Sequence, residues 1–217
     1  MTATTAAPAS AAPAAARRPI PAAAFAHHRP FIGPAAKKYG QKALTDAYVE
    51  AVNYAFLSGW DPALIGHSVN QLSAADLRIA RAPLTSAART VFDRTFAGAK
   101  RGEAAAVRKL EQLVFFDVRA PGGLTPATDG RVVLDRKFTE PAVGLDHAHG
   151  VQRLWITFAA RATIRMTDGK GHFYALPTSR TLRYWLVPNP RTGPGAVPFL
   201  FDAAAVRMTL NKPTATS

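Results

Sequence analysis

The chain has 217 residues, 48% of them hydrophobic, so it is long enough to bury one sizeable core. It contains no cysteine, which excludes a disulfide framework, a thiol nucleophile and a cysteine-rich zinc site. The formal net charge of +13 favours nucleic acid, an acidic lipid surface or an acidic protein as partner, unless the arginine and alanine bias merely reflects a GC-rich genome.

No apolar run in the sequence approaches the ~18 residues of a membrane span, and none resembles the hydrophobic core of a signal peptide. We therefore expect a cytoplasmic protein, at most peripheral to a membrane-bound assembly, with no transmembrane segment.

Residues 1–40 form a low-complexity segment of alanine, proline and threonine. Six prolines by position 34 preclude a continuous helix, and few large apolar groups are present to offset the entropy of ordering. No acidic residue occurs before Asp46, so the segment is basic. We predict a disordered basic tail. If the chain has a nucleic-acid partner, this tail is the segment expected to contact it.

Apolar residues at three- and four-residue spacing predict a helical region after the tail. Leu44, Tyr48 and Val52 set the pattern in its first helix, and Pro83 must close the second. The predicted helices cover residues 41–57, a segment from about 73 to 83, 85–97 and 103–113.

The last sixty residues predict a sheet, because apolar and polar side chains alternate in three runs. The runs are 153–166, 180–187 and 206–210, with turn residues after the first. In the first run one side is Leu154, Ile156, Phe158, Ala160, Ala162, Ile164 and Met166, and the other is Arg153, Trp155, Thr157, Arg161, Thr163 and Arg165.

Shorter strands are predicted at 114–118 and 131–135. Residues 141–150 are predicted to be a loop.

Helices followed by a meander of strands indicate an α+β protein with its helices packed on one face of a curved, mostly antiparallel sheet. We expect one domain over residues 41–211 and a short tail at 212–217. The run 154–166, the turn Asp168-Gly169, the run 179–187 and a closing strand are together similar to the cone-shaped fold named after nuclear transport factor two, also called cystatin-like.

Within that fold, the chain resembles most the domains of conjugation and type IV secretion assembly proteins found in actinobacteria and other Gram-positive bacteria. The resemblance spans about residues 41 to 210. It implies a scaffold without catalysis, which associates with itself through its sheet or contacts other subunits of such machinery.

The strongest candidate site is the polar side of the predicted sheet, where arginines alternate with tryptophans. Such a surface suits a protein interface, and it also suits single-stranded nucleic acid, which stacks on aromatic rings. A third interpretation is that the tail or a helix covers the tryptophans. The residues are Trp155, Arg161, Arg165, Arg183, Trp185 and Arg207.

A pocket between helices and sheet is the alternative, since enzymes and ligand-binding modules on cone-shaped folds use one. Tyr48, Asp117 and Tyr184 are its candidate residues, and a carboxylate among apolar walls would act as a base unless an arginine pairs with it. No ligand is indicated by the sequence.

Asp146, His147 and His149 have metal-capable side chains, but a pair of ligands is not a site. A third ligand would have to come from His172, Asp168 or Asp135, and a closed zinc site needs about four. We expect no metal and no cofactor. The motifs of common hydrolases and nucleotide-binding proteins are absent from the sequence, so an enzyme is the less favoured interpretation.

Overall fold

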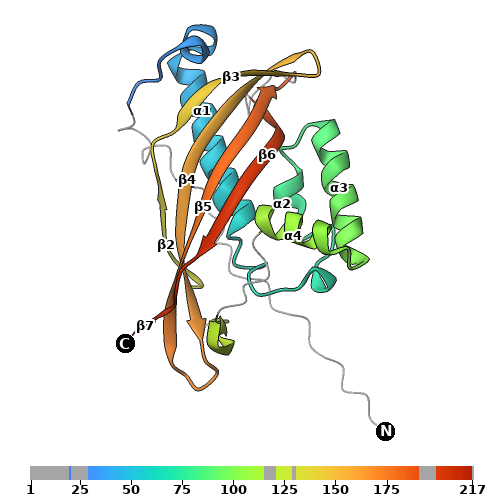
Figure 1. Cartoon of the computed structure of the whole chain (residues 1–217). Helices are drawn as coiled ribbons and strands as arrows, with labels where there is room; N and C mark the ends of the chain where they lie inside the picture. Colours follow the sequence, from blue (N-terminus) through green and yellow to red (C-terminus); the bar gives the residue numbers. More distant parts are fainter. Residues whose placement is uncertain (1–19, 21–28, 115–120, 129–130, 191–198, 217) are drawn as a thin grey trace.

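A long antiparallel sheet curves around one long helix, and three shorter helices lie beside it (Figure 1). The computed structural model describes residue 20 and residues 29–114, 121–128, 131–190 and 199–216. The helices are α1 (Pro34–Gly59), α2 (Arg78–Arg81), α3 (Ser86–Lys100) and α4 (Ala104–Leu113), with 3-10 turns at Val69–Gln71 and Pro121–Gly123. The strands are β1 (Thr125–Pro126), β2 (Val133–Phe138), β3 (Ala142–Ala148), β4 (Val151–Thr167), β5 (Phe173–Pro188), β6 (Phe199–Leu210) and β7 (Thr214–Thr216).

β4 is the centre of the sheet. It pairs with β5 along one edge and with β1, β2 and β3 in succession along the other, and β5 pairs in turn with β6 and β7. All of these pairings are antiparallel, so the predicted α+β class with a mostly antiparallel sheet is confirmed. No helix in the described ranges is long and apolar enough to cross a membrane.

The alternation of side chains in β4 separates a buried face from an open one. Every second residue from Leu154 to Met166 is buried, and α1 passes behind β4 and β5 in Figure 1, on that buried side. Tyr48, Val52 and Phe56 of α1 belong to the same apolar core. Burying one face of each strand against a helix is what fixes the register of such a sheet.

The predicted boundary between tail and domain falls inside α1. The helix begins at Pro34 rather than at residue 41, with non-helical backbone at Gly40, and Ala35 in its first turn is only 1% exposed. The half-buried Ile20 donates its N–H to the side-chain oxygen of Asn53 at 2.7 Å. The remainder of the predicted tail, residues 1–19 and 21–28, lies outside the described residues.

Several strands are longer than predicted. Residues 141–150, predicted to be a loop, contain β3, which pairs with β4 from Ala142↔Thr157 to Ala148↔Val151. β5 starts at Phe173 and β6 at Phe199, and the expected terminal tail contains β7. The strand predicted at 114–118 is not tested, because Val114 caps the end of α4 and residues 115–118 lie outside the described part.

Candidate interface on the outer face of the sheet

The side of the sheet that faces away from α1 holds all six residues of the arginine and tryptophan pattern. We call this side, over β4, β5 and β6, the outer face. Trp155 of β4 is directly opposite Trp185 of β5, and Arg207 of β6 is opposite Thr181 of β5. Residues opposite one another in antiparallel strands point to the same face, so register alone brings these side chains together.

The two tryptophans are stacked with arginines of their own sheet. The guanidinium carbon of Arg183 lies 4.9 Å from the ring centroid of Trp155 and 5.9 Å from that of Trp185. Arg153 approaches the ring of Trp185 at 5.6 Å. We call these four residues, Arg153, Trp155, Arg183 and Trp185, the tryptophan–arginine ladder.

A glycine on the neighbouring strand makes room for the ladder. Gly144 of β3 is the register partner of Trp155, and a Cβ atom at position 144 would overlap the indole ring. The ring of Trp155 therefore has the β3 backbone on one side and Arg183 near it, and it is only partly exposed. Cation–π contacts of this kind contribute about 0.5–1 kcal/mol each at exposed sites.

Two carboxylates hold Arg153 in place, and sequence reasoning did not include them in the site. Its guanidinium contacts Asp146 of β3 at 2.8 Å and Asp202 of β6 at 3.2 Å. Asp146 also accepts a hydrogen bond from the indole N–H of Trp185 at 2.9 Å. The hydrogen bond from Arg153 is the main reason that the pKa of Asp146 lies below its ordinary value. The signal available in the sequence was only that Asp146 precedes a histidine pair.

The remaining arginines of the outer face differ in the contacts that they make with neighbouring side chains. Arg165 lies over the ring of Phe173, with its guanidinium carbon 3.5 Å from the centroid. Arg161, Arg183 and Arg207 are exposed and make no ion pair with any residue that the structure describes. The surface between them consists of small side chains, namely Ala159, Ser179, Thr181, Ala203, Ala205 and Thr209.

The alternative pocket residues lie in packed surroundings. Tyr48 is 1% exposed and donates its hydroxyl to the carbonyl of Thr139 at 2.6 Å, and Tyr184 is 3% exposed. Both rings contact Phe158, at centroid distances of 5.8 and 6.1 Å, and burial raises the pKa of both hydroxyls far above the ordinary value. The third candidate, Asp117, lies outside the described residues.

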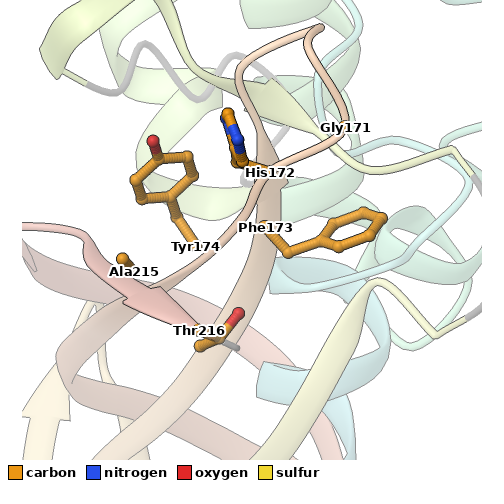
Figure 2. A pocket seen from close by; sticks show the side chains of 6 residues that line it. All are labelled: Gly171, His172, Phe173, Tyr174, Ala215 and Thr216. Atoms are coloured by element: carbon orange, nitrogen blue, oxygen red, sulfur yellow. The ribbon is translucent and has the colours of Figure 1, made fainter.

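An open hollow is found elsewhere, where the start of β5 meets β7 (Figure 2). Its lining residues are Gly171, His172, Phe173, Tyr174, Ala215 and Thr216. Nearby, His172 contacts the carboxylate of Asp168 at 2.8 Å, and this contact lowers the pKa of Asp168. The hollow is not lined by Tyr48 or Tyr184 of the predicted pocket, nor by the six residues of the outer face.

The histidine motif is divided between β3 and the turn that follows it. Asp146 is paired with Arg153, while His147 and His149 are exposed. Across the described ranges, no three histidine, cysteine or acidic side chains are grouped closely enough to hold a metal ion.

Comparisons with protein-family models, with curated proteins and with solved structures found no match to this chain. The α+β class therefore rests on the structure itself, and the resemblance to cone-shaped assembly domains remains a prediction from the sequence pattern.

Proposed function

We propose that this protein is a non-enzymatic scaffold that binds an acidic protein partner through the outer face of its sheet. The observation that supports it best is the set of three exposed arginines on the outer face. They are Arg161 and Arg207, which lie among small side chains, and Arg183 of the tryptophan–arginine ladder. Tryptophan and arginine are enriched where protein interfaces bury most of their energy. The order of helices and strands suggests, as a finer proposal, that the partner is a subunit of a conjugative transfer or secretion apparatus.

An acidic partner suits this surface better than a second copy of the same face. Few acids lie near it, and each already has a cationic neighbour: Asp135 lies 3.9 Å from Lys137, and Asp146 and Asp202 share Arg153. Two such faces brought together would place arginines against arginines, and like charges brought together across an interface cost several kcal/mol. Carboxylates on a partner would instead pair with these arginines in bidentate geometry.

Protein is favoured over single-stranded nucleic acid because of the tryptophan rings. Binding of single strands relies on bases that stack on open aromatic faces. Here Gly144 lies against the ring of Trp155 and the guanidinium carbon of Arg183 lies 4.9 Å from its centroid, so less of the ring is open to a stacking base. Exposed arginines still attract carboxylates when the aromatic rings beside them are partly covered, because a guanidinium binds a carboxylate through charge and hydrogen bonds.

The test is site-specific photocrosslinking in the source cells, with the crosslinker at Thr181 on the outer face or, as a control, at Arg108 on α4. We expect an acidic protein to be crosslinked from position 181 only. The double reversal Arg161→Glu with Arg207→Glu should abolish this product.

The matched control is Arg94→Glu with Arg108→Glu, which changes the net charge equally on exposed helix positions and should leave the product intact. Products that are insensitive to the outer-face reversal would overturn the proposal. So would tight, salt-sensitive binding of the purified chain to an oligothymidylate that the outer-face reversal removes, because it would assign the same arginines to nucleic acid.

A further inference from the structure

Strand β6 has a long edge that no other strand of the described residues pairs with. One side of β6 pairs with β5. On the other side, Phe201 at the start donates its N–H to Pro83 at 2.9 Å and accepts from Thr85 at 2.8 Å. After Phe201, no residue in the described ranges pairs with that side. Ala203, Ala204 and Ala205 are all exposed, although Ala204 shares the inward-facing parity.

The hydrogen bonds to β5 show which backbone groups of β6 are free. The N–H of Asn211 donates to the carbonyl of Pro177 at 3.1 Å, and the register from Ala203 to Leu210 contains no irregularity. Hydrogen-bonded and non-bonded residue pairs alternate along an antiparallel ladder. Because Asn211 is hydrogen-bonded to β5, the odd-numbered residues of β6 back to Ala203 also direct their N–H and C=O toward β5. Ala204, Val206 and Met208 therefore direct their N–H and C=O groups away from β5, toward the other side of β6.

We propose that this edge pairs antiparallel with β6 of a second copy of the chain, with Ala205 opposite Ala205 on the two-fold axis. In that register Ala204 of one copy faces Val206 of the other, and both have outward-directed N–H and C=O groups that can bond. Inward-facing residues meet inward-facing residues, as a continuous sheet requires. The residues on the axis are alanines, which allow the close approach of a non-bonded pair.

Charge complementarity favours this register and favours a second copy of the chain as the partner. Arg207 falls opposite Ala203 of the second copy, next to Asp202 of that copy. Asp202 lies on the outer face, because its carboxylate contacts Arg153 at 3.2 Å, and Arg207 is on the same face. Centring the pair on position 207 would instead set two arginines directly opposite each other, which destabilises a sheet.

The edge also lacks the features that usually keep strands apart. Between Ala203 and Leu210 there is no proline, no lysine and no bulge, and Arg207 is the one charged residue. Pairing uses the edge and leaves the outer face open, so two arginine surfaces would lie side by side. The inference is therefore independent of the acidic partner proposed above.

The absence of cysteine from the chain permits a direct test. Ala205→Cys should give a covalent dimer on mild oxidation, because thiols in directly opposed, non-bonded strand positions lie within disulfide reach. Ala203→Cys is the matched control, with the same residue type, face and exposure. Its two thiols would be four residues apart along the paired strands, about 13 Å, and no dimer should form.

Sedimentation of the full chain at rising concentration gives a second measurement. The native chain should shift toward twice the monomer mass, and Ala204→Pro should lose the shift, because it removes an outward N–H while keeping the ladder to β5. Equal crosslinking of both cysteine variants would overturn the proposal, as would a monomeric Ala205→Cys variant. If the proline variant does not fold, the two cysteine variants decide alone, and partner capture from position 181 is unaffected by either result.

Discussion

Two arginine–tryptophan contacts occur on opposite faces of β5, and their surroundings differ sharply. Arg180 faces the core, where it is 1% exposed and lies 4.7 Å from the ring of Trp60. Arg183, three positions later, faces outward and stacks on Trp155 at 4.9 Å. Burial lowers the pKa of Arg180 to about 10. Arg183 is exposed and also donates to the hydroxyl of Thr157 at 2.9 Å.

Each contact depends on a glycine. Next to Trp60, a Cβ at Gly59 would overlap the guanidinium of Arg180, as a Cβ at Gly144 would overlap the ring of Trp155. Inside, Arg180 also donates to the carbonyl of Leu113 at 3.3 Å, so it connects the end of α4 to the sheet. An arginine–tryptophan contact thus packs the core on one face of β5, whereas on the other face it presents positive charge.

We expect removal of Arg180 and removal of Arg183 to change the free energy of unfolding by very different amounts. Arg180→Ala should lower the free energy of unfolding by about 3 kcal/mol, because it leaves a cavity beside Trp60 and removes the hydrogen bond to Leu113. Arg183→Ala should cost less than about 1 kcal/mol, as expected for an exposed cation–π contact. Urea unfolding followed by far-ultraviolet circular dichroism measures both. Equal losses for the two variants would contradict the assignment of Arg183 to binding rather than packing.

The two glycines should show the same contrast at smaller magnitude. Gly59→Ala should cost about 1–3 kcal/mol, because Arg180 is enclosed and cannot move aside without strain. Gly144→Ala should cost under about 1 kcal/mol, since the partly exposed ring of Trp155 can swing outward. The same urea experiment measures both changes.

The double variant Gly59→Ala with Arg180→Met provides the control. If the alanine acts through Arg180, the two losses will be less than additive, because the shortened side chain removes the overlap. Additive losses would mean that Gly59 matters for the backbone of the helix end instead.

Strand alternation was the part of the fold that the sequence predicted well. The half-buried pattern from Leu154 to Met166 admits one assignment of faces, because a one-residue slip would expose the whole apolar set. The predicted run began at Arg180, so the first residues of β5, 173–179, were missed, and the burial of Arg180 was not predicted. Nothing in the local pattern indicates that Trp60 and Leu113, distant in sequence, enclose it.

Other errors have local physical causes. Pro34 was interpreted as a helix breaker, yet proline is favoured in the first turn, where α1 places it. β3 was missed because Gly144 and the histidines interrupt its apolar alternation. The link from Asp146 to Arg153 and Trp185 depends on the pairing of β3, β4 and β5, which only the folded sheet defines.

The smallest predicted effect concerns the charge of Asp146 in the ladder. Its pKa lies below the ordinary value of 3.8, chiefly because Arg153 donates to the carboxylate. A carboxyl whose folded-state pKa is depressed stabilises the protein above its unfolded pKa, and this contribution is lost as the pH falls through the folded pKa. Asp146→Asn removes the charge and retains an acceptor for the indole of Trp185.

The stability gap between the native chain and Asp146→Asn should therefore be present at pH 7 and should close as the pH falls below the ordinary carboxyl pKa of 3.8. Urea midpoints read from tryptophan fluorescence measure the gap at each pH. Other carboxyl groups titrate in both proteins and cancel in the difference. A gap that stays constant down to pH 2 would mean that Arg153 is held by Asp202 and by stacking on Trp185 alone, so that the outer ladder, like Arg180 in the core, is maintained by packing more than by charge.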